Sequence, residues 1–353
     1  MSSSEYLLTI IFAIYTPIFF LVFLSLLDYS KYYLKYKTER ILLILYILSL
    51  SLIFSLRPLA LGMDTQNYFD LYFYQYSTPD FKLSSELLFH LLARVSQIMG
   101  GFEVFLFLIS FISMYSLYYF SRRVLEGDKF HSISFILFFM ISGISFIPMQ
   151  INTLKVGLAI SIMLVGLHYL LKNKMKFFYL ISIIAFLIHN SIIVMIVSGV
   201  LVHYIKSPLR VYFSGYLIVI ALSYFQVIKI YNIQFLGDFL LYYQGYYAGN
   251  YKVGFRLDFV LYNTIWLLFA YVFQKKLNIT DFWLKIYIVL SCIFFLSFEM
   301  PYSDRIGMFS WVVAPIMLAT SFNVLKNPYK SLKWPFLAIF SIKPSTFLTE
   351  AVL

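Results

Sequence analysis

The chain has 353 residues, of which 61% are hydrophobic and 12% charged, and its mean hydropathy is +0.84. Soluble domains average about 45–50% apolar and about 25% charged residues, so this composition excludes a soluble protein and predicts an integral membrane protein. The net charge of +11 indicates membrane orientation rather than a nucleic-acid partner, and the single cysteine, Cys292, excludes a disulfide framework.

Apolar runs separated by charged breaks predict an all-α helical bundle with about 11 membrane segments, some of them short or broken. The first run begins at Tyr6 and lacks a basic leading region, so we interpret it as a transmembrane helix rather than a cleavable signal. The polar pair His189-Asn190 interrupts the short run 177–188, which predicts a tight hairpin or a helix broken within the membrane. The expected segments are 6–27, 41–56, 103–120, 132–147, 154–171, 177–188, 191–205, 211–228, 257–273, 282–298 and 306–323.

Charge alternates from one break to the next. Every second break is basic, and these breaks together hold 18 of the 27 Lys and Arg residues and a net charge of +13, whereas the others sum to −2. Because basic loops stay in the cytoplasm, this predicts an outer N-terminus and a cytoplasmic C-terminus. We expect one multi-pass membrane domain over 1–330, with long outer loops at 57–102 and 229–256 and a short tail at 331–353. Tyrosines of the second loop fit an interfacial belt or, alternatively, a surface that stacks on sugars.

The first outer loop begins with a polar cluster, from Arg57 to Tyr72, that directly follows an uninterrupted apolar run. Polar residues are costly to hold near lipid, so a functional interpretation is favoured. Gly62 supplies backbone freedom for a bend, and Pro58 ends the preceding helix. The sequence contains no metal-ligand spacing, Walker loop or dinucleotide fingerprint, so we expect no metal, nucleotide or other cofactor.

The candidate residues share a predicted position on the outer side or high in the membrane. Arginine suits phosphate or carboxylate recognition, and a carboxylate or histidine can take a proton from an attacking hydroxyl. The catalytic candidates are Arg57, Asp64, Glu86 and His189, with the choice of general base among the last three left open. The substrate-binding candidates are Asn67, Tyr68, Tyr72, Gln150, Asn152, Lys155, Arg256, Asp304 and Arg305.

Each candidate also has a structural interpretation. Glu86 fits a solvated loop acid, and Lys155 fits a snorkelling residue at a helix end. Asp304 and Arg305 fit a local ion pair, and His189 alone fits a structural hydrogen-bonding residue. Their shared placement on the less basic side of the membrane favours the functional interpretation, and it predicts extracytoplasmic chemistry.

Four motifs occur in order along the chain. They are Arg57…Gly62-Met-Asp64-Thr-Gln-Asn67-Tyr68…Tyr72 with Ser85-Glu86-Leu-Leu-Phe89, then Asn152-Thr-Leu-Lys155-Val-Gly157-Leu-Ala159, then Phe186-Leu-Ile-His189-Asn190-Ser191, and Asp304-Arg305. Together, over about 57–310, they resemble the EpsG-type, Wzy-like polysaccharide polymerases. Lys155 stands where that family usually has Arg, and Val156 where it usually has Gln. The positive charge is kept but the bidentate fork is lost.

This resemblance implies an enzyme that joins oligosaccharide repeat units carried on undecaprenyl pyrophosphate, at the outer face of the bacterial cytoplasmic membrane. The product would be O-antigen, capsule or exopolysaccharide, made without metal or nucleotide. The implied partners are the lipid-linked oligosaccharide, the bilayer and a chain-length regulator protein, with no nucleic acid. The rival interpretations are a polysaccharide-related transporter or flippase and a membrane O-acyltransferase. Charges gathered in outer loops disfavour the first, and an outward His189 disfavours the second.

Overall fold

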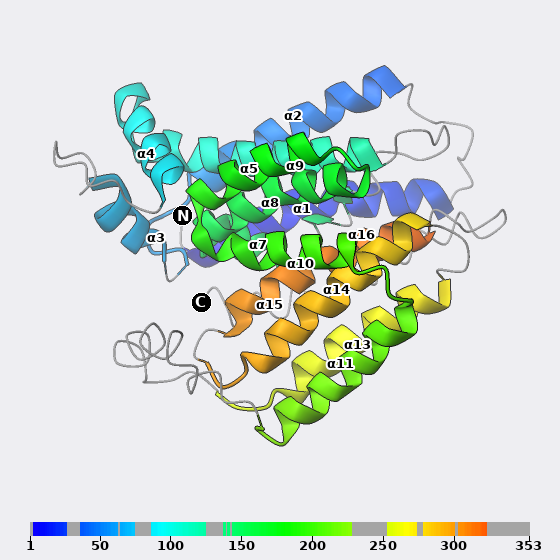
Figure 1. Cartoon of the computed structure of the whole chain (residues 1–353). Helices are drawn as coiled ribbons and strands as arrows, with labels where there is room; N and C mark the ends of the chain where they lie inside the picture. Colours follow the sequence, from blue (N-terminus) through cyan, green and yellow to red (C-terminus); the bar gives the residue numbers. More distant parts are fainter. Residues whose placement is uncertain are drawn as a thin grey trace. The chain divides into compact units, whose positions relative to one another are not determined.

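A computed structural model describes residues 3–26, 36–62, 64–74, 86–124, 137–138, 140–141, 143–227, 253–273, 278–300 and 303–322. Within these ranges every regular element is a helix, which confirms the predicted all-α class (Figure 1). The chain forms two compact units, one that extends to Ile196 and one that begins at Val197. The tail 331–353, most of the second outer loop and part of the expected segment 132–147 lie outside the described residues.

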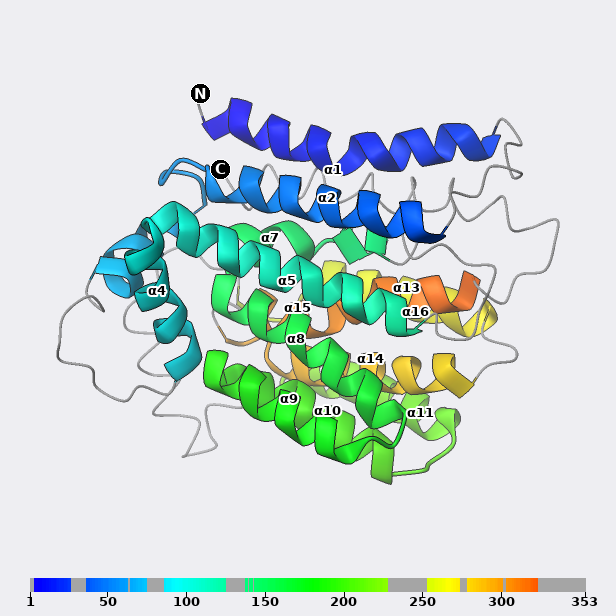
Figure 2. The same cartoon turned by 90° about the horizontal axis from the view of Figure 1, so that it is seen from above.

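Five long helices form the frame of the first unit. They are α1 (Ser3–Leu26), α2 (Tyr36–Ser55), α5 (Phe102–Val124), α8 (Leu154–Leu171) and α9 (Met175–Ile188). Each packs against the next in this order, as Figure 2 shows. Shorter elements lie between them: α3 (Thr65–Asn67), the π-helical η1 (Tyr68–Tyr74), α4 (Leu87–Met99), α7 (Phe146–Ile151) and the 3₁₀ turn η3 (Asn190–Ile192).

The segment 57–102, expected as a long loop, contains the helical elements α3, η1 and α4. α4 packs against α5 and α9, because Phe89, Ala93 and Ser96 lie at helical spacing on its buried face. The Phe89 ring meets Phe105 of α5 with centroids 5.3 Å apart. This contact holds the start of α4 near the bundle, and the candidate Glu86 immediately precedes that helix.

In the second unit, α14 is the central helix. α10 (Ile193–Tyr204) leads into the unit, followed by α11 (Leu209–Tyr224), α13 (Leu257–Phe273), α14 (Asn278–Leu296), α15 (Ser303–Trp311) and α16 (Val313–Phe322). α14 packs against α11, α13, α15 and α16. Its Phe294 ring contacts Phe259 and Trp311, with centroids 5.4 and 5.3 Å apart.

The expected continuous segment 306–323 is interrupted. α15 ends with the Val312 N–H donating to Met308 O at 3.0 Å, and α16 starts at Val313. Pro315 explains the break, because proline lacks an N–H and is tolerated in the first turn of a helix but not in its middle. The sequence pattern of apolar residues continues across this point and therefore did not reveal it.

Two helices among the described residues, α5 and α8, are long and apolar enough by themselves to cross a membrane. Several others are apolar but have only 10–17 residues in the range searched, including those at 175–188, 209–224 and 257–272. The span count and the orientation stay predictions of the charge and hydropathy pattern.

Candidate functional site

After α2 the chain folds back against the C-terminal end of α7. Arg57 is only 5% exposed, and its Nη1 donates to Gln150 O at 2.7 Å while Nη2 donates to Ile151 O at 3.4 Å. The last carbonyls of a helix have no partner within it, so this guanidinium caps α7. Burial lowers the pKa of Arg57 to about 10, and the side chain therefore stays charged at neutral pH. Buried Arg57 thus links the segment after α2 to the C-terminal end of α7.

The bend predicted at Gly62 is present. Its φ is +81°, and a Cβ at this position would overlap the Ile151 side chain and the Asn152 amide oxygen. Both the left-handed conformation and the close approach require glycine. Thr65, fully buried, donates from Oγ1 to Leu61 O at 2.6 Å and completes the turn. The polar segment after α2 is thereby pressed onto the turn that begins α8.

The turn before α8 determines where Lys155 lies. Thr153 occupies the N-cap position, and its carbonyl accepts from Gly157 N at 2.7 Å. A Cβ at Gly157 would lie 2.5 Å from Met149 O, so the glycine permits the close packing of α8 on α7. Gln150, 1% exposed, donates to Ser113 Oγ of α5 at 2.9 Å and belongs to the buried frame. Asn152 is also buried, whereas Lys155 lies in the first turn of α8 and is partly exposed.

Three candidates meet in one cluster. Glu86 Oε2 lies 2.9 Å from Lys155 Nζ, and Glu86 Oε1 lies 2.6 Å from His189 Nδ1. The side chains of Glu86, Lys155 and His189 are 14%, 15% and 21% exposed, so the cluster is largely buried but remains accessible from outside the protein. Glu86 comes from the start of α4, Lys155 from the first turn of α8, and His189 from the break between α9 and η3. Lys155 and His189 are 69 and 103 residues away from Glu86 in the sequence, so the fold brings distant parts of the chain into contact.

The charge state of the cluster follows from its contacts. Burial alone raises the pKa of Glu86, but the hydrogen bond from His189 and the charge of Lys155 outweigh it, and the pKa lies below its ordinary value. Glu86 is therefore a carboxylate at neutral pH and accepts on both oxygens. A neutral His189 then carries its proton on Nδ1, which leaves Nε2 as a proton acceptor.

His90 was not among the sequence candidates. It lies one turn after Glu86 in α4, is 1% exposed, and its backbone N–H donates to Glu86 O at 3.1 Å. Burial lowers the pKa of His90; the Glu86 charge opposes this effect and the Lys155 charge adds to it. The imidazole is thus neutral at neutral pH. The spacing Glu86-x-x-x-His90, which puts both residues on one helix face, was the available signal.

The other first-unit candidates lie around the turn that contains α3. Asp64 precedes α3 and is half-buried, and Asn67 is exposed. Tyr68 is buried, and its ring centroid lies 6.0 Å from that of Phe89, so it contributes to packing around α4. Tyr72 belongs to η1, and its side chain lies outside the described residues.

The second unit holds a separate charged group. Arg256 donates through Nε and Nη2 to the two carboxylate oxygens of Asp258 at 3.0 and 2.7 Å, and its guanidinium lies 4.3 Å from the Phe259 ring centroid. Burial raises the pKa of Asp304, and the charges of Arg305 and Arg256 oppose that rise. The three second-unit candidates therefore share one electrostatic neighbourhood.

Comparison with protein families identifies the chain. The family model described as the EpsG family matches residues 40–344. The chain belongs to the EpsG family. This match confirms the resemblance that the motifs indicated, and the matched range contains every candidate residue. Comparisons with curated proteins and with solved structures give no match.

EpsG family membership indicates a membrane protein with a polysaccharide polymerase-type function. The apolar helices α5 and α8 agree with a membrane location. In this EpsG chain the residues Glu86, Lys155 and His189 come from three of the four motif segments, and the fold joins them. Within the described ranges, no three His, Cys, Asp or Glu side chains are grouped closely enough to hold a metal ion.

Proposed function

We propose that this EpsG-family protein joins oligosaccharide repeat units carried on undecaprenyl pyrophosphate, at the outer face of the bacterial cytoplasmic membrane. The product is a surface polysaccharide of the O-antigen, capsule or exopolysaccharide type. The observation that carries the proposal is the cluster in which Glu86 contacts both Lys155 and His189. It combines a proton acceptor and a cation, which are the two groups that glycosyl transfer from a pyrophosphate requires.

The reaction forms one glycosidic bond. A hydroxyl oxygen of the acceptor unit attacks the anomeric carbon of the donor, and the bond from that carbon to the pyrophosphate oxygen breaks. Undecaprenyl pyrophosphate leaves with the bonding electron pair, and the hydroxyl proton passes to His189 Nε2. Glu86 holds the imidazole by its Nδ1–H and stabilises the imidazolium that forms, since the carboxylate is already ionised.

Cations are assigned to the leaving group. Lys155 lies beside the reacting histidine, linked to it through Glu86, and its ammonium stabilises negative charge on the departing pyrophosphate. Within the second unit, Arg256, Asp304 and Arg305 are proposed as a separate group of substrate-binding residues. Asp64 and Asn67 are proposed to contact sugar hydroxyls. Arg57 is proposed to act through position, because its Nη1 and Nη2 groups donate to backbone carbonyls.

The test is a reconstitution assay with a labelled lipid-linked repeat unit. Purified protein in proteoliposomes should convert it into a ladder of longer lipid-linked chains without added nucleotide. Movement of the label across the bilayer without lengthening would instead identify a flippase, and acylated sugar would identify an acyltransferase. Either of those outcomes overturns the proposal.

A matched pair of variants links the ladder to the cluster. Glu86→Gln keeps the size of the side chain but removes the charge that holds Lys155 and orients His189, so the ladder should shrink by about 10²-fold or more. Glu103→Gln makes the same change at an exposed position in the first turn of α5 and should leave the ladder unchanged. Equal losses in both variants would contradict the assignment of Glu86.

A further inference from the structure

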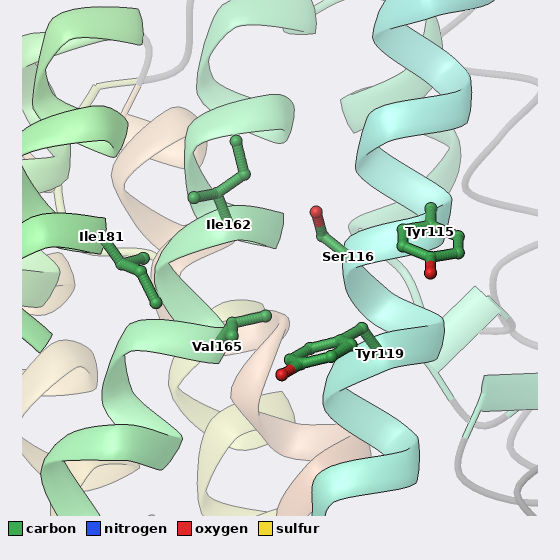
Figure 3. Close-up of a pocket in the computed structure, with 6 residues that line it drawn as sticks. All are labelled: Tyr115, Ser116, Tyr119, Ile162, Val165 and Ile181. Atoms are coloured by element: carbon green, nitrogen blue, oxygen red, sulfur yellow. The ribbon is translucent and has the colours of Figure 1, made fainter. Parts of the chain in front are cut away.

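An open groove of about 180 Å³ runs over α8 between α5 and α9 (Figure 3). Its lining residues are Tyr115, Ser116 and Tyr119 of α5, Ile162 and Val165 of α8, and Ile181 of α9. Apart from hydroxyl groups the lining is apolar. Sites for whole small molecules span about 300–1,000 Å³, so this groove suits a segment of a larger molecule. Its apolar lining favours an extended apolar chain over a sugar unit, whose hydroxyls need polar partners.

The groove opens beside a face that contacts lipid. Phe177, Leu180 and Ile183 of α9 are 54%, 56% and 59% exposed. In a membrane protein such apolar side chains face the acyl chains of the bilayer, because water would disfavour them. Ile181 of the same helix lines the groove, so an acyl chain that packs on this apolar face lies next to the groove.

Two cations lie at one end of the groove. The hydroxyls of Tyr119 and Tyr169 are 2.8 Å apart and join α5 to α8. The Arg123 guanidinium lies 4.9 Å from the Tyr119 ring centroid, and the Lys174 ammonium lies 6.0 Å from that of Tyr169. The ring faces attract these cations, so each tyrosine of the pair holds one positive charge, and Tyr119 itself lines the groove.

The surroundings of this end are basic. The segments 119–124 and 169–177 contain five Lys or Arg residues and no acid. The charge alternation along the chain predicts that these segments lie at the cytoplasmic leaflet, where anionic lipids attract basic side chains. Charge complementarity therefore selects an anionic occupant, and the apolar lining selects one with an acyl chain.

We propose that the groove binds an anionic glycerophospholipid of the bilayer. One acyl chain lies along Ile162, Val165 and Ile181, and the phosphate is held by Arg123 and Lys174. Neither the groove nor these cations belong to the Glu86 cluster, so the proposal does not depend on the proposed polymerase reaction.

Native mass spectrometry of the purified full chain tests the head-group contact. The protein is exchanged into equal amounts of phosphatidylglycerol, phosphatidylcholine and undecaprenyl phosphate, and the retained lipid is measured. Wild type should retain phosphatidylglycerol. A basic residue near the membrane surface changes binding of anionic lipid about fivefold, so the double variant Arg123→Gln/Lys174→Gln should lower retention about 25-fold relative to phosphatidylcholine. The control Lys206→Gln/Arg210→Gln removes the same charge at exposed positions on the same predicted side. It should leave the retention of phosphatidylglycerol unchanged.

A second pair tests the acyl-chain contact. Ile162→Trp fills the groove and should displace phosphatidylglycerol, whereas Ile183→Trp adds the same bulk at a residue 59% exposed and should leave retention unchanged. Equal retention of phosphatidylglycerol by wild type, by Arg123→Gln/Lys174→Gln and by Ile162→Trp would overturn the proposal. So would preferential retention of phosphatidylcholine, which would remove the role of the cations, or of undecaprenyl phosphate, which would replace the occupant.

Discussion

At the scale of single residues, the Glu86 carboxylate organises the candidate site, because each of its oxygens contacts a different partner. The contact with His189 restricts the ring to one orientation and one tautomer. The hydrogen bond with His189 and the charge of Lys155 together keep the carboxylate ionised although it is largely buried. A glutamate in this setting is a poor proton acceptor, and among the three sequence candidates for the general base we favour His189.

His189→Gln tests this choice. Glutamine keeps a hydrogen-bond donor for Glu86 but has no basic nitrogen, so polymer formation should fall by about 10²–10⁴-fold. His203→Gln makes the same change at a half-buried position of α10 and should have no effect on the ladder. The measurement is the initial rate of chain extension with equal amounts of folded protein. A rate for His189→Gln within about threefold of wild type, far below that range, would exclude it as the base.

Acid should weaken the cluster, because its contacts require the ionised form of Glu86. The pKa of Glu86 is held below its ordinary value of 4.5, so the stabilisation from its ionised form is complete above that pH and is lost as pH falls through the lower, folded-state pKa. The difference in melting temperature between wild type and Glu86→Gln should thus not decline from neutral pH to about 5 and should shrink at lower pH. A difference that already declines between pH 7 and 6 would contradict this charge state.

Arg57 presents a different case, because its charge is used inside the protein. Arg57→Ala would remove the donor to Gln150 O and one of the two donors to Ile151 O, which should lower the free energy of unfolding by about 2 kcal/mol and reduce activity with it. Arg57→Lys retains one donor group, so its free energy of unfolding should lie between those of wild type and Arg57→Ala. Thermal unfolding of the purified variants measures this effect. Normal stability with no polymer formation would instead assign Arg57 to the substrate, as the sequence motif suggested.

At the scale of elements, the Gly62 turn couples the polar segment after α2 to the turn between α7 and α8. Gly62→Ala combines an unfavourable left-handed residue with overlap against Ile151 and Asn152, and it should destabilise the protein by about 2 kcal/mol or more. Gly215→Ala is the matched control. A Cβ there meets no heavy atom within 4 Å, and alanine is the better helix former, so stability should be equal or slightly higher. Equal unfolding temperatures for wild type and Gly62→Ala would contradict the packing of this turn.

The cluster forms where the ends of three helices meet. The helix break at His189 directs its side chain away from the α9 ladder, since the residue adopts an extended backbone with φ of −159°. The N-terminal turn of α8 presents Lys155, and the aromatic contacts of α4 bring Glu86 to them. Each of the three residues lies at the end of a helix. At a helix end a side chain can point beyond the helix and reach residues of other helices.

At the scale of the whole molecule, the orientation in the membrane decides which side the cluster serves. In a background with Cys292→Ser, cysteines at the exposed positions Gln66 and Val253 should react with an impermeant thiol reagent in intact spheroplasts. Cysteines at the exposed positions Lys174 and Lys206 should react only after permeabilisation. The expectation follows from the retention of basic breaks in the cytoplasm. A reversal between the two pairs would place the Glu86 cluster on the cytoplasmic side and exclude an outward-facing polymerase site.

The membrane class, the helical architecture and the family follow from the amino-acid sequence alone. These properties depend on sums and on local order: hydropathy adds along the chain, and four motifs keep their order whatever their spatial arrangement. The sequence also predicted helix positions well where a long apolar run is bounded by charge, as in 154–171 and 257–273. It missed α4 within the first outer loop and the break at Val312, because short helices and single turns leave only a weak pattern.

The set of candidates that meet in space follows from the packing of the helices and could not be predicted from the sequence. The motif around Arg57 and Asp64 was the most conspicuous in the sequence, yet the fold turns Arg57 to the backbone of α7 and brings Glu86 to Lys155 and His189. The physical reason is that a contact across 69 or 103 residues depends on how α4, α8 and α9 pack, and packing is set by shape and burial over the entire unit. No local pattern of residues carries that information.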